Sequence, residues 1–358
     1  MKWTALSMMG AVALLHPGAS IAESTLSAGV WANYRYVMDD TRDEETFGDI
    51  ADEALIIYAD GAADDDEGIW SYSAELRIGP GSFTDSANNS TGDTFTLHKA
   101  WVGFELTPTH KLIVGKSQVP FAWKTVNFWP GDGLQAGYGD QMDVGVKLVS
   151  GSRVGYQLAY YHADDWGETS TDTVDDNGHW GSSTTYRKVQ TVVGNVDFPL
   201  TDNQTVSISA QAGRLQALVP MMEQEVDGQH HAVALHYHGR FDDFYVKAEF
   251  IDAQRELPDV FLATDPALPD EVANQRAGLE LGYKQGNWFW YLDAHAANPD
   301  TDGSSADTVY SYSPGFSYDY GPGWVYVEYL GQTGFVDRNG LVGEGDFDAF
   351  YVSMDFYL

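Results

Sequence analysis

The sequence predicts one all-β domain, a transmembrane antiparallel up-and-down β-barrel of about sixteen strands. Three observations predict it. Apolar residues recur at every second position in many short segments, short and long connections alternate between these segments, and no stretch after residue 23 is apolar enough to cross a membrane as a helix. The chain has 358 residues, of which 43% are hydrophobic, so an ordered protein with a large buried surface is expected.

The first 22 residues have the pattern of a signal peptide. Lys2 supplies the positive start, the stretch 5–15 is a short apolar core, and Ser20-Ile21-Ala22 is a small-residue cleavage site. This apolar stretch is shorter than the roughly 20 residues of a helical membrane anchor. We therefore expect export through the Sec pathway with cleavage after Ala22, which leaves residues 23–358 as the barrel domain.

The last strand shows the alternation most clearly. In AFYVSMDFYL the residues Phe350, Val352, Met354, Phe356 and Leu358 form one apolar face, and the residues between them are polar or amphipathic. One apolar and one polar face is expected where lipid lies outside a barrel and water inside. The same reading gives strands near 26–38, 47–59, 69–79, 99–106, 109–117, 142–148, 154–161, 189–198, 205–214, 230–238, 243–252, 275–284, 287–296, 308–318, 323–331 and 347–358.

The connections support a barrel with two different rims. Short turns lie near 106–110, 149–153, 199–204, 239–242, 284–287 and 319–323, and longer polar loops near 39–46, 80–93, 118–138, 163–184, 217–228, 255–273, 297–307 and 332–345. In outer-membrane barrels the short turns are periplasmic and the long loops extracellular. A soluble sandwich or propeller would also show alternating strands, but the signal peptide and the loop rhythm favour the barrel.

Composition excludes several functions. A net charge of −34 repels nucleic acid, and the absence of cysteine excludes disulfides and thiolate metal sites. His230, His236 and His238 share one face of a predicted strand, but no neighbouring carboxylate completes a metal site. Loose Ca²⁺ binding by acidic loops stays open. No catalytic or phosphate-binding motif is present, so we expect neither an enzyme nor a cofactor.

The stretch around the third long loop resembles bacterial porins, and more closely the phosphate-selective porin O and P family. In that family a strand ending in a Gly-Lys/Gln-x-x-x-Pro-Phe segment leads into a loop, and an Asp-x-Gly strand follows it. The resemblance is clearest over residues 95–162. The matching residues are Gly115, Lys116, Pro120 and Phe121, followed by Asp143, Val144 and Gly145.

The resemblance implies that residues 118–138 form a constriction loop folded into the barrel; a loop packed on the rim is the alternative. It also implies a homotrimer in the outer membrane of a Gram-negative cell, in contact with lipid and lipopolysaccharide. Family members line their channels with Arg and Lys to attract anions. This chain has only 19 Lys and Arg against 53 Asp and Glu, so the resemblance leaves phosphate selectivity open.

Alternation places both signs of charge in the channel. Inward candidates among the bases include Lys247 and Arg276, interleaved with Glu249 and Glu280, and Lys124 and Asp132 bring opposite charges in the loop. Lys116 is ambiguous, because it shares the phase of apolar residues at the end of its strand. The residues expected to line the pore or its constriction are Arg35, Glu75, Arg77, Lys99, Glu105, Lys116, Lys124, Asp132, Asp143 and Lys147.

These observations predict a porin for passive diffusion of small hydrophilic solutes and ions. An anion or phosphate channel is the alternative within this class. A surface adhesin or receptor anchored by its barrel is the alternative from another class.

Overall fold

The computed structural model of the chain describes residues 23–40, 49–63, 68–79, 95–123, 126–128, 142–163, 186–219, 222, 225–337 and 339–358. The expected signal peptide and the loop residues Lys124 and Asp132 lie outside these residues.

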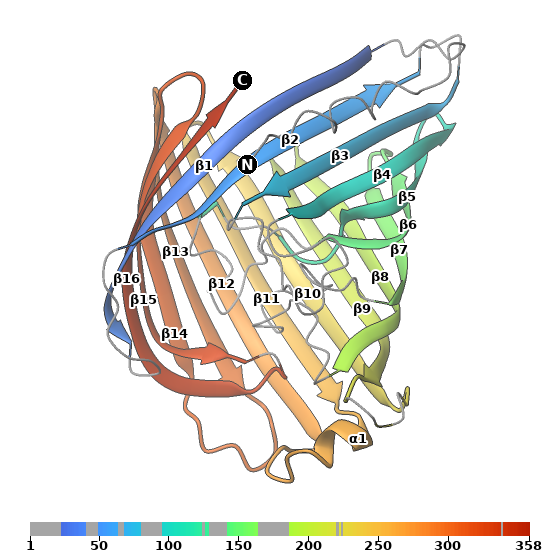
Figure 1. Ribbon diagram of the computed structural model, residues 1–358, viewed down its shortest axis with the longest axis vertical. Coiled ribbons are helices and arrows are strands. Elements are labelled where there is room, and N and C mark those ends of the chain that lie inside the picture. Colours follow the sequence, from blue (N-terminus) through green and yellow to red (C-terminus); the bar gives the residue numbers. More distant parts are fainter. Residues whose placement is uncertain are drawn as a thin grey trace, which may run out of the picture.

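The described residues form sixteen strands and one short helix (Figure 1). The strands are β1 (Glu23–Asp40), β2 (Asp49–Ala62), β3 (Trp70–Ile78), β4 (Phe95–Thr107), β5 (His110–Gln118), β6 (Met142–Ser150), β7 (Gly155–Ala163), β8 (Tyr186–Thr201), β9 (Gln204–Ala217), β10 (Gly228–Phe241), β11 (Phe244–Glu256), β12 (Glu271–Gln285), β13 (Trp288–Pro299), β14 (Val309–Asp319), β15 (Trp324–Val336) and β16 (Val342–Tyr357). The helix is α1 (Asp259–Leu262).

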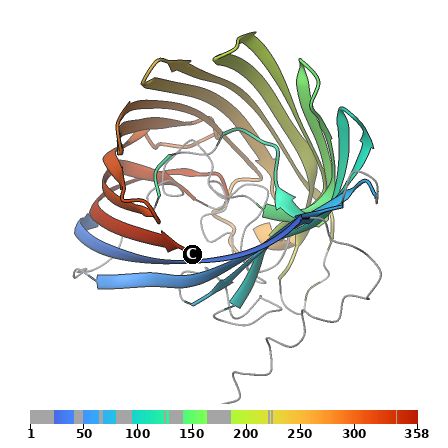
Figure 2. The same ribbon diagram turned by 90° about the horizontal axis from the view of Figure 1, so that it is seen from above.

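The strands close into one barrel, in which each pairs antiparallel with its sequence neighbours and β1 pairs with β16. At this seam Val30 lies opposite Phe356 and Tyr34 opposite Val352. Figure 2 shows the ring from above, with the segment after β5 running inside it. Closure gives each strand a hydrogen-bonding partner on both sides, which backbone groups within a membrane require.

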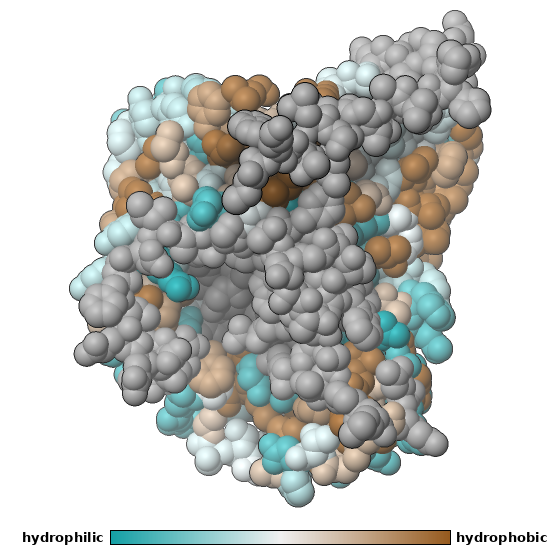
Figure 3. Space-filling model, in the orientation of Figure 1, coloured by the Kyte–Doolittle hydropathy of each residue, from teal (hydrophilic) through white to brown (hydrophobic). Residues whose placement is uncertain are grey.

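The two faces of the wall differ as the alternation predicts. Val144 and Leu235 point outward and are 49% and 52% exposed, whereas Asp143 and Glu280 are turned inward and are 0% and 2% exposed. Apolar residues gather on the outer wall at the right of Figure 3. The apolar face of β16 also points outward, with Phe350 and Met354 exposed.

Several strands are longer than the sequence predicts. β8 covers Tyr186–Thr201 instead of 189–198, and β12 covers Glu271–Gln285 instead of 275–284. The alternation weakens at strand ends, where apolar residues such as Val272 of β12 are buried in contacts with other segments and do not mark the outer face. The prediction of a long loop over 332–345 is also wrong: β15 continues to Val336 and β16 begins at Val342, and both valines are buried in one cluster with Ala297 and Val309.

The helix α1 has four residues and lies in the connection between β11 and β12. Among the described residues, no helix has the length and apolar character needed to span a membrane.

Candidate functional site

The inner wall of the barrel is polar and charged, yet much of it is shielded from water. Buried inward residues include Glu75, Arg77, Lys147, Glu249, Glu280 and Glu328. Because a buried charge is costly unless it is paired or hydrogen-bonded, the groups that cover these side chains are central to the site.

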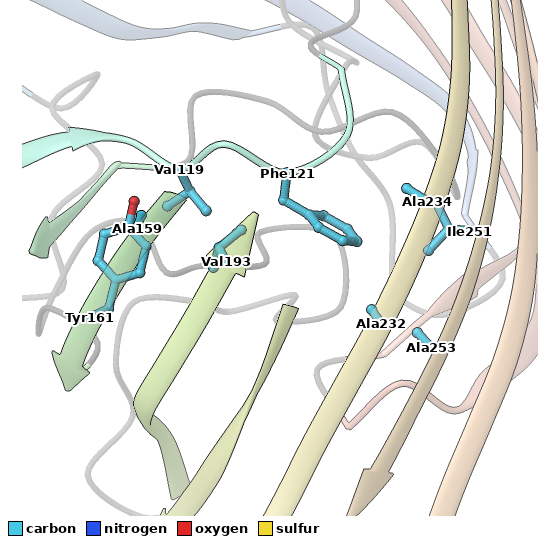
Figure 4. Close-up of a cluster of buried hydrophobic side chains, with 9 residues drawn as sticks. All are labelled: Val119, Phe121, Ala159, Tyr161, Val193, Ala232, Ala234, Ile251 and Ala253. Carbon is cyan, nitrogen blue, oxygen red and sulfur yellow. The ribbon is translucent and has the colours of Figure 1, made fainter. Parts of the chain in front are cut away.

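The chain enters the lumen directly after β5. Val119 and Phe121 are 2% and 3% exposed and pack into one apolar cluster on the wall (Figure 4). Their seat includes Ala159 of β7 and Ala232 and Ala234 of β10. Small inward side chains leave room for a loop against the wall, so this row of alanines defines where it docks.

Ala122 turns the loop from this seat towards the next strands. Its φ is +56°, in the left-handed region that costs a non-glycine residue roughly 1 kcal/mol. The Ala122 N–H donates a hydrogen bond to Ser209 Oγ of β9 at 3.1 Å. This bond fixes the loop at the turn.

Beyond the turn, three backbone N–H groups of the loop donate to carboxylates on β11, β12 and β15. These carboxylates lie nearer the short-turn ends of their strands than the long-loop ends. A hydrogen bond to a charged carboxylate contributes about 1.5–3 kcal/mol to stability, which is more than a hydrogen bond between neutral groups contributes. The pairs are Trp123 to Glu249 at 3.2 Å, Val126 to Glu280 at 2.8 Å and Phe128 to Glu328 at 2.8 Å.

Lys247 of β11 reinforces the middle of this attachment. Its Nζ lies 3.0 Å from the Glu280 carboxylate and 4.8 Å from the centre of the Trp123 ring. The same ring stacks on His295 of β13, at 6.4 Å between centroids. The loop is therefore held by charge, ring contacts and hydrogen bonds together.

At Phe128 the loop has reached the wall where the barrel closes. The Phe128 ring stacks on Tyr326 of β15 at 4.7 Å and meets Trp31 of β1 edge-on at 5.8 Å. The Arg77 guanidinium lies 4.9 Å from the Trp31 ring and bonds Glu75 at 2.8 Å. Between β5 and this point the described loop residues contact β7, β9, β10, β11, β12, β13, β15 and β1.

Two further residues expected in the pore are inward and buried. Lys147 donates to the Gln118 carbonyl at 2.6 Å, at the point where β5 ends and the loop begins. Asp143 is 0% exposed and accepts a hydrogen bond from the Val144 N–H at 2.7 Å. Both therefore lie at the root of the loop.

The remaining expected residues are less closely tied to the loop. Arg35 lies on the inward-facing side of β1 and is exposed, and Lys99 is half-buried opposite Glu75. Glu105 lies near the short-turn end of β4, where it pairs with Lys111 at 3.3 Å.

Lys116 follows Gly115, whose φ of +120° marks an irregularity in β5. Its register partner Val144 is exposed on the outer wall, but Lys116 itself is buried. The register alone would place Lys116 on the outer face with Val144, but its side chain is shielded from the surface.

Glu328, Tyr291 and Asp293 are inner-wall residues that were not among those predicted from the sequence. The Tyr291 hydroxyl donates a hydrogen bond to the Glu328 carboxylate at 2.7 Å, and Asp293 is 0% exposed. Strand alternation could have identified two of these residues. Trp290 and Leu292 form the apolar face of their strand, so Tyr291 and Asp293 between and beside them are expected on the opposite, inward face.

His230, His236 and His238 share the inward face of β10, as the alternation predicts. His230 is bonded to Thr191 at 3.0 Å, and His236 to Ser209 at 3.1 Å. No group of three potential metal ligands occurs among the described residues.

Comparisons with known proteins bear on the fold. No family model and no curated protein sequence matches the chain. Among solved structures, OmpF of Salmonella typhi, in complex with daunomycin, aligns with a TM-score of 0.64 at 12% identity over 94% of this chain and 97% of its own.

The chain has the porin fold. An anion-selective porin from Comamonas acidovorans aligns with a TM-score of 0.60 at 11% identity, over 94% of this chain and 99% of that one. The trimer form of OmpT, an outer-membrane protein of Vibrio cholerae, aligns at 0.63 and 11% identity, over 94% and 99%. The described part of the loop after β5 lies inside this barrel.

Proposed function

We propose that the protein is an outer-membrane porin through which small hydrophilic solutes and ions diffuse passively. One observation carries the proposal: a closed barrel with an apolar outer face holds a loop across its polar interior through three inward carboxylates. Solutes cross without turnover chemistry.

The loop of residues 118–138 is the proposed constriction. Its described part leaves the wall at β5 and reaches β15 and β1, so it narrows the lumen. Lys124 lies in the sequence between Trp123 and Val126, which are both bonded to the wall. We place Lys124, and Asp132 further along the loop, at the narrow part of the channel.

The charges of the wall suit polar solutes. Carboxylates on β11, β12 and β15 lie on the side to which the loop is fastened, and Arg77 and Lys147 project from β3 and β6. Opposite charges across a narrow, low-dielectric channel produce a transverse field. Such a field favours small polar molecules over apolar ones.

We place the barrel in the outer membrane, exported by the Sec pathway with cleavage after Ala22, as a homotrimer in contact with lipid and lipopolysaccharide. The outward belt of large apolar side chains supports a lipid environment. Intact mass of the purified protein checks the cleavage site, and sedimentation in detergent checks the oligomeric state.

The first test is single-channel conductance in a planar bilayer, with a KCl gradient to read the reversal potential. A large ohmic step with weak selectivity is the expected result. The absence of conductance from a folded barrel would contradict the proposal and favour a barrel-anchored adhesin or receptor.

An anion or phosphate channel, related to the porin O and P family, is the second candidate. It is favoured by the buried inward bases, which include Lys147 and Arg276. A strong anion preference suppressed by added phosphate would select this candidate over the general porin.

A further inference from the structure

The far ends of β15 and β16 leave the barrel wall and fold over its inner face. Pairing between them shifts register after Gln332, and Gly345 has a φ of +156° at the same place. Such a β-bulge bends a hairpin. We call the part beyond this bend, from Gly334 to Gly343, the inward hairpin.

The inward hairpin lies over β13 and β14. β16 contacts both strands, although β15 separates it from them in the barrel order. Val336 and Val342 of the hairpin are buried in one cluster with Ala297 of β13 and Val309 of β14. A Cβ on Gly334 would lie within 2.3 Å of the Val309 side chain, so the close approach requires glycine there.

The tip of the hairpin is a compact turn built around Asp337. The Asp337 Oδ1 accepts hydrogen bonds from the N–H groups of Asn339 and Leu341, both at 2.8 Å. Gly340 takes the left-handed conformation, with φ +93°, and its N–H donates to the Asp337 carbonyl at 2.9 Å. These local bonds define the shape of the tip.

The tip docks at a distance from its own strands. Asn274 of β12 donates its side-chain amide to the Gly340 carbonyl at 2.7 Å, and Tyr186 of β8 donates its hydroxyl to Asn339 Oδ1 at 3.3 Å. Leu341 packs against the apolar cluster that contains Leu215 of β9. That cluster also contains Phe261 of α1 and Val272 of β12.

These contacts place the inward hairpin across the long-loop mouth, since Tyr186, Leu215 and Val272 all lie at that end of their inward faces. Figure 1 shows the red ends of β15 and β16 bending towards α1 there. The loop inside the barrel is fastened to Glu249, Glu280 and Glu328, nearer the short-turn end. A solute that enters from the mouth therefore meets the inward hairpin first.

We propose that the inward hairpin is a second constriction, in series with the loop after β5, and that it determines the largest hydrophilic solute that enters. The inference rests on the proposed porin function. It assigns the size limit to Asn339, Gly340 and Leu341 and their seat on β8, β9 and β12.

The test compares the wild-type protein with two variants that undock the tip. N339A/L341S removes the bond to Tyr186 and the apolar anchor, and a second variant replaces residues 337–341 with two glycines. The matched control deletes Ser304 and Ser305, which are exposed in the connection between β13 and β14 and carry no charge. Heat-modifiable migration on gels and circular dichroism establish that each barrel is folded.

Conductance in 1 M KCl and liposome swelling with sugars of increasing size are the readouts. Undocking should raise single-channel conductance by roughly two-fold, as expected for a wider water-filled path, and admit sugars that the wild type excludes. The control should match the wild type. Folded variants with unchanged conductance and sugar cutoff would overturn the inference and leave the porin function standing. If neither the wild type nor the variants conduct, the porin function itself fails.

Discussion

Glu280 has a position that links the wall to the loop. Its carboxylate accepts the Val126 N–H at 2.8 Å and lies 3.0 Å from Lys247 Nζ. Directly opposite on β13 is Asp293, which is also buried. Two buried carboxylates side by side are unfavourable, so the attached loop and Lys247 together stabilise this part of the wall.

Replacing Glu280 with alanine should loosen the loop without unfolding the barrel. The change removes a charge-assisted bond that contributes about 1.5–3 kcal/mol, and leaves Lys247 without this partner. We expect noisier open-channel current and higher mean conductance in planar bilayers, with normal heat-modifiable migration.

Glu105→Ala is the matched control, because Glu105 forms an exposed pair with Lys111 at 3.3 Å. Exposed ion pairs contribute at most about 1 kcal/mol. The open-channel current of Glu280→Ala could be no noisier than that of the wild type, or no noisier than that of Glu105→Ala. Either result would show that the Glu280 carboxylate does not hold the loop.

Lys124→Glu addresses the position of the loop relative to the ion path. Since Trp123 and Val126 are both bonded to the inner wall, the intervening charge should be close to the solute. We expect the reversal potential in a KCl gradient to shift towards cation preference. An unchanged permeability ratio would mean that Lys124 does not face the channel.

At the level of strands, alternation predicted which face of each element is apolar. It worked because an apolar and a polar surface lie on opposite sides of one layer, as in β16, where Phe350 is exposed and Ser353 is buried. It failed at strand ends, such as the far part of β15 and β16, where that contrast is lost. Residues such as Val336 and Val342 are apolar because they pack on β13 and β14, which no local pattern reveals.

The seam between β16 and β1 offers a test of the lipid-facing assignment. Val352 lies opposite Tyr34 on β1 and Val327 on β15, within the outward apolar face. Val352→Asp should lower the yield of assembled barrel, because a charged side chain on the lipid face is destabilising: about 2–4 kcal/mol for Lys or Arg at mid-depth, and less for Asp. The measurement is the yield of heat-modifiable barrel on gels after refolding.

Arg35→Asp provides the control at the same seam. Arg35 lies opposite Tyr351 but is on the inward face and exposed, so a carboxylate there should allow normal assembly. Equal yields from Val352→Asp and Arg35→Asp would contradict the assignment of the faces.

For the molecule as a whole, the sequence determined the class of fold more fully than the interior. Strand number, the rhythm of the loops and the inward position of Glu75, Arg77, Asp143 and Lys147 could be predicted, because they depend on neighbours along one strand. The attachment of Val126 to Glu280 or of Asn339 to Tyr186 joins residues more than 150 positions apart. Such contacts depend on how a loop crosses the lumen, and periodicity does not encode that path.

The net charge of −34 should affect ion selectivity at the long-loop mouth. The connection between β13 and β14 carries Asp300, Asp302 and Asp307, all exposed, and no base. Acidic groups around a water-filled opening attract cations and repel anions over about one Debye length, which is about 10 Å at 0.1 M salt and about 3 Å at 1 M. Cation preference in a KCl gradient should therefore be strongest at low salt and nearly vanish at high salt.

The variant D300N/D302N/D307N separates this effect from the charges inside the lumen. It should reduce cation preference at about 0.1 M KCl and leave conductance at about 1 M unchanged, because screening at high salt already removes the contribution of exposed groups. If the triple variant keeps the full salt dependence, the charges that set ion preference lie deeper, at the loop after β5. An anion preference that persists at every salt concentration would instead place the deciding charges among the inward bases, and the channel would then belong with the anion-selective candidate.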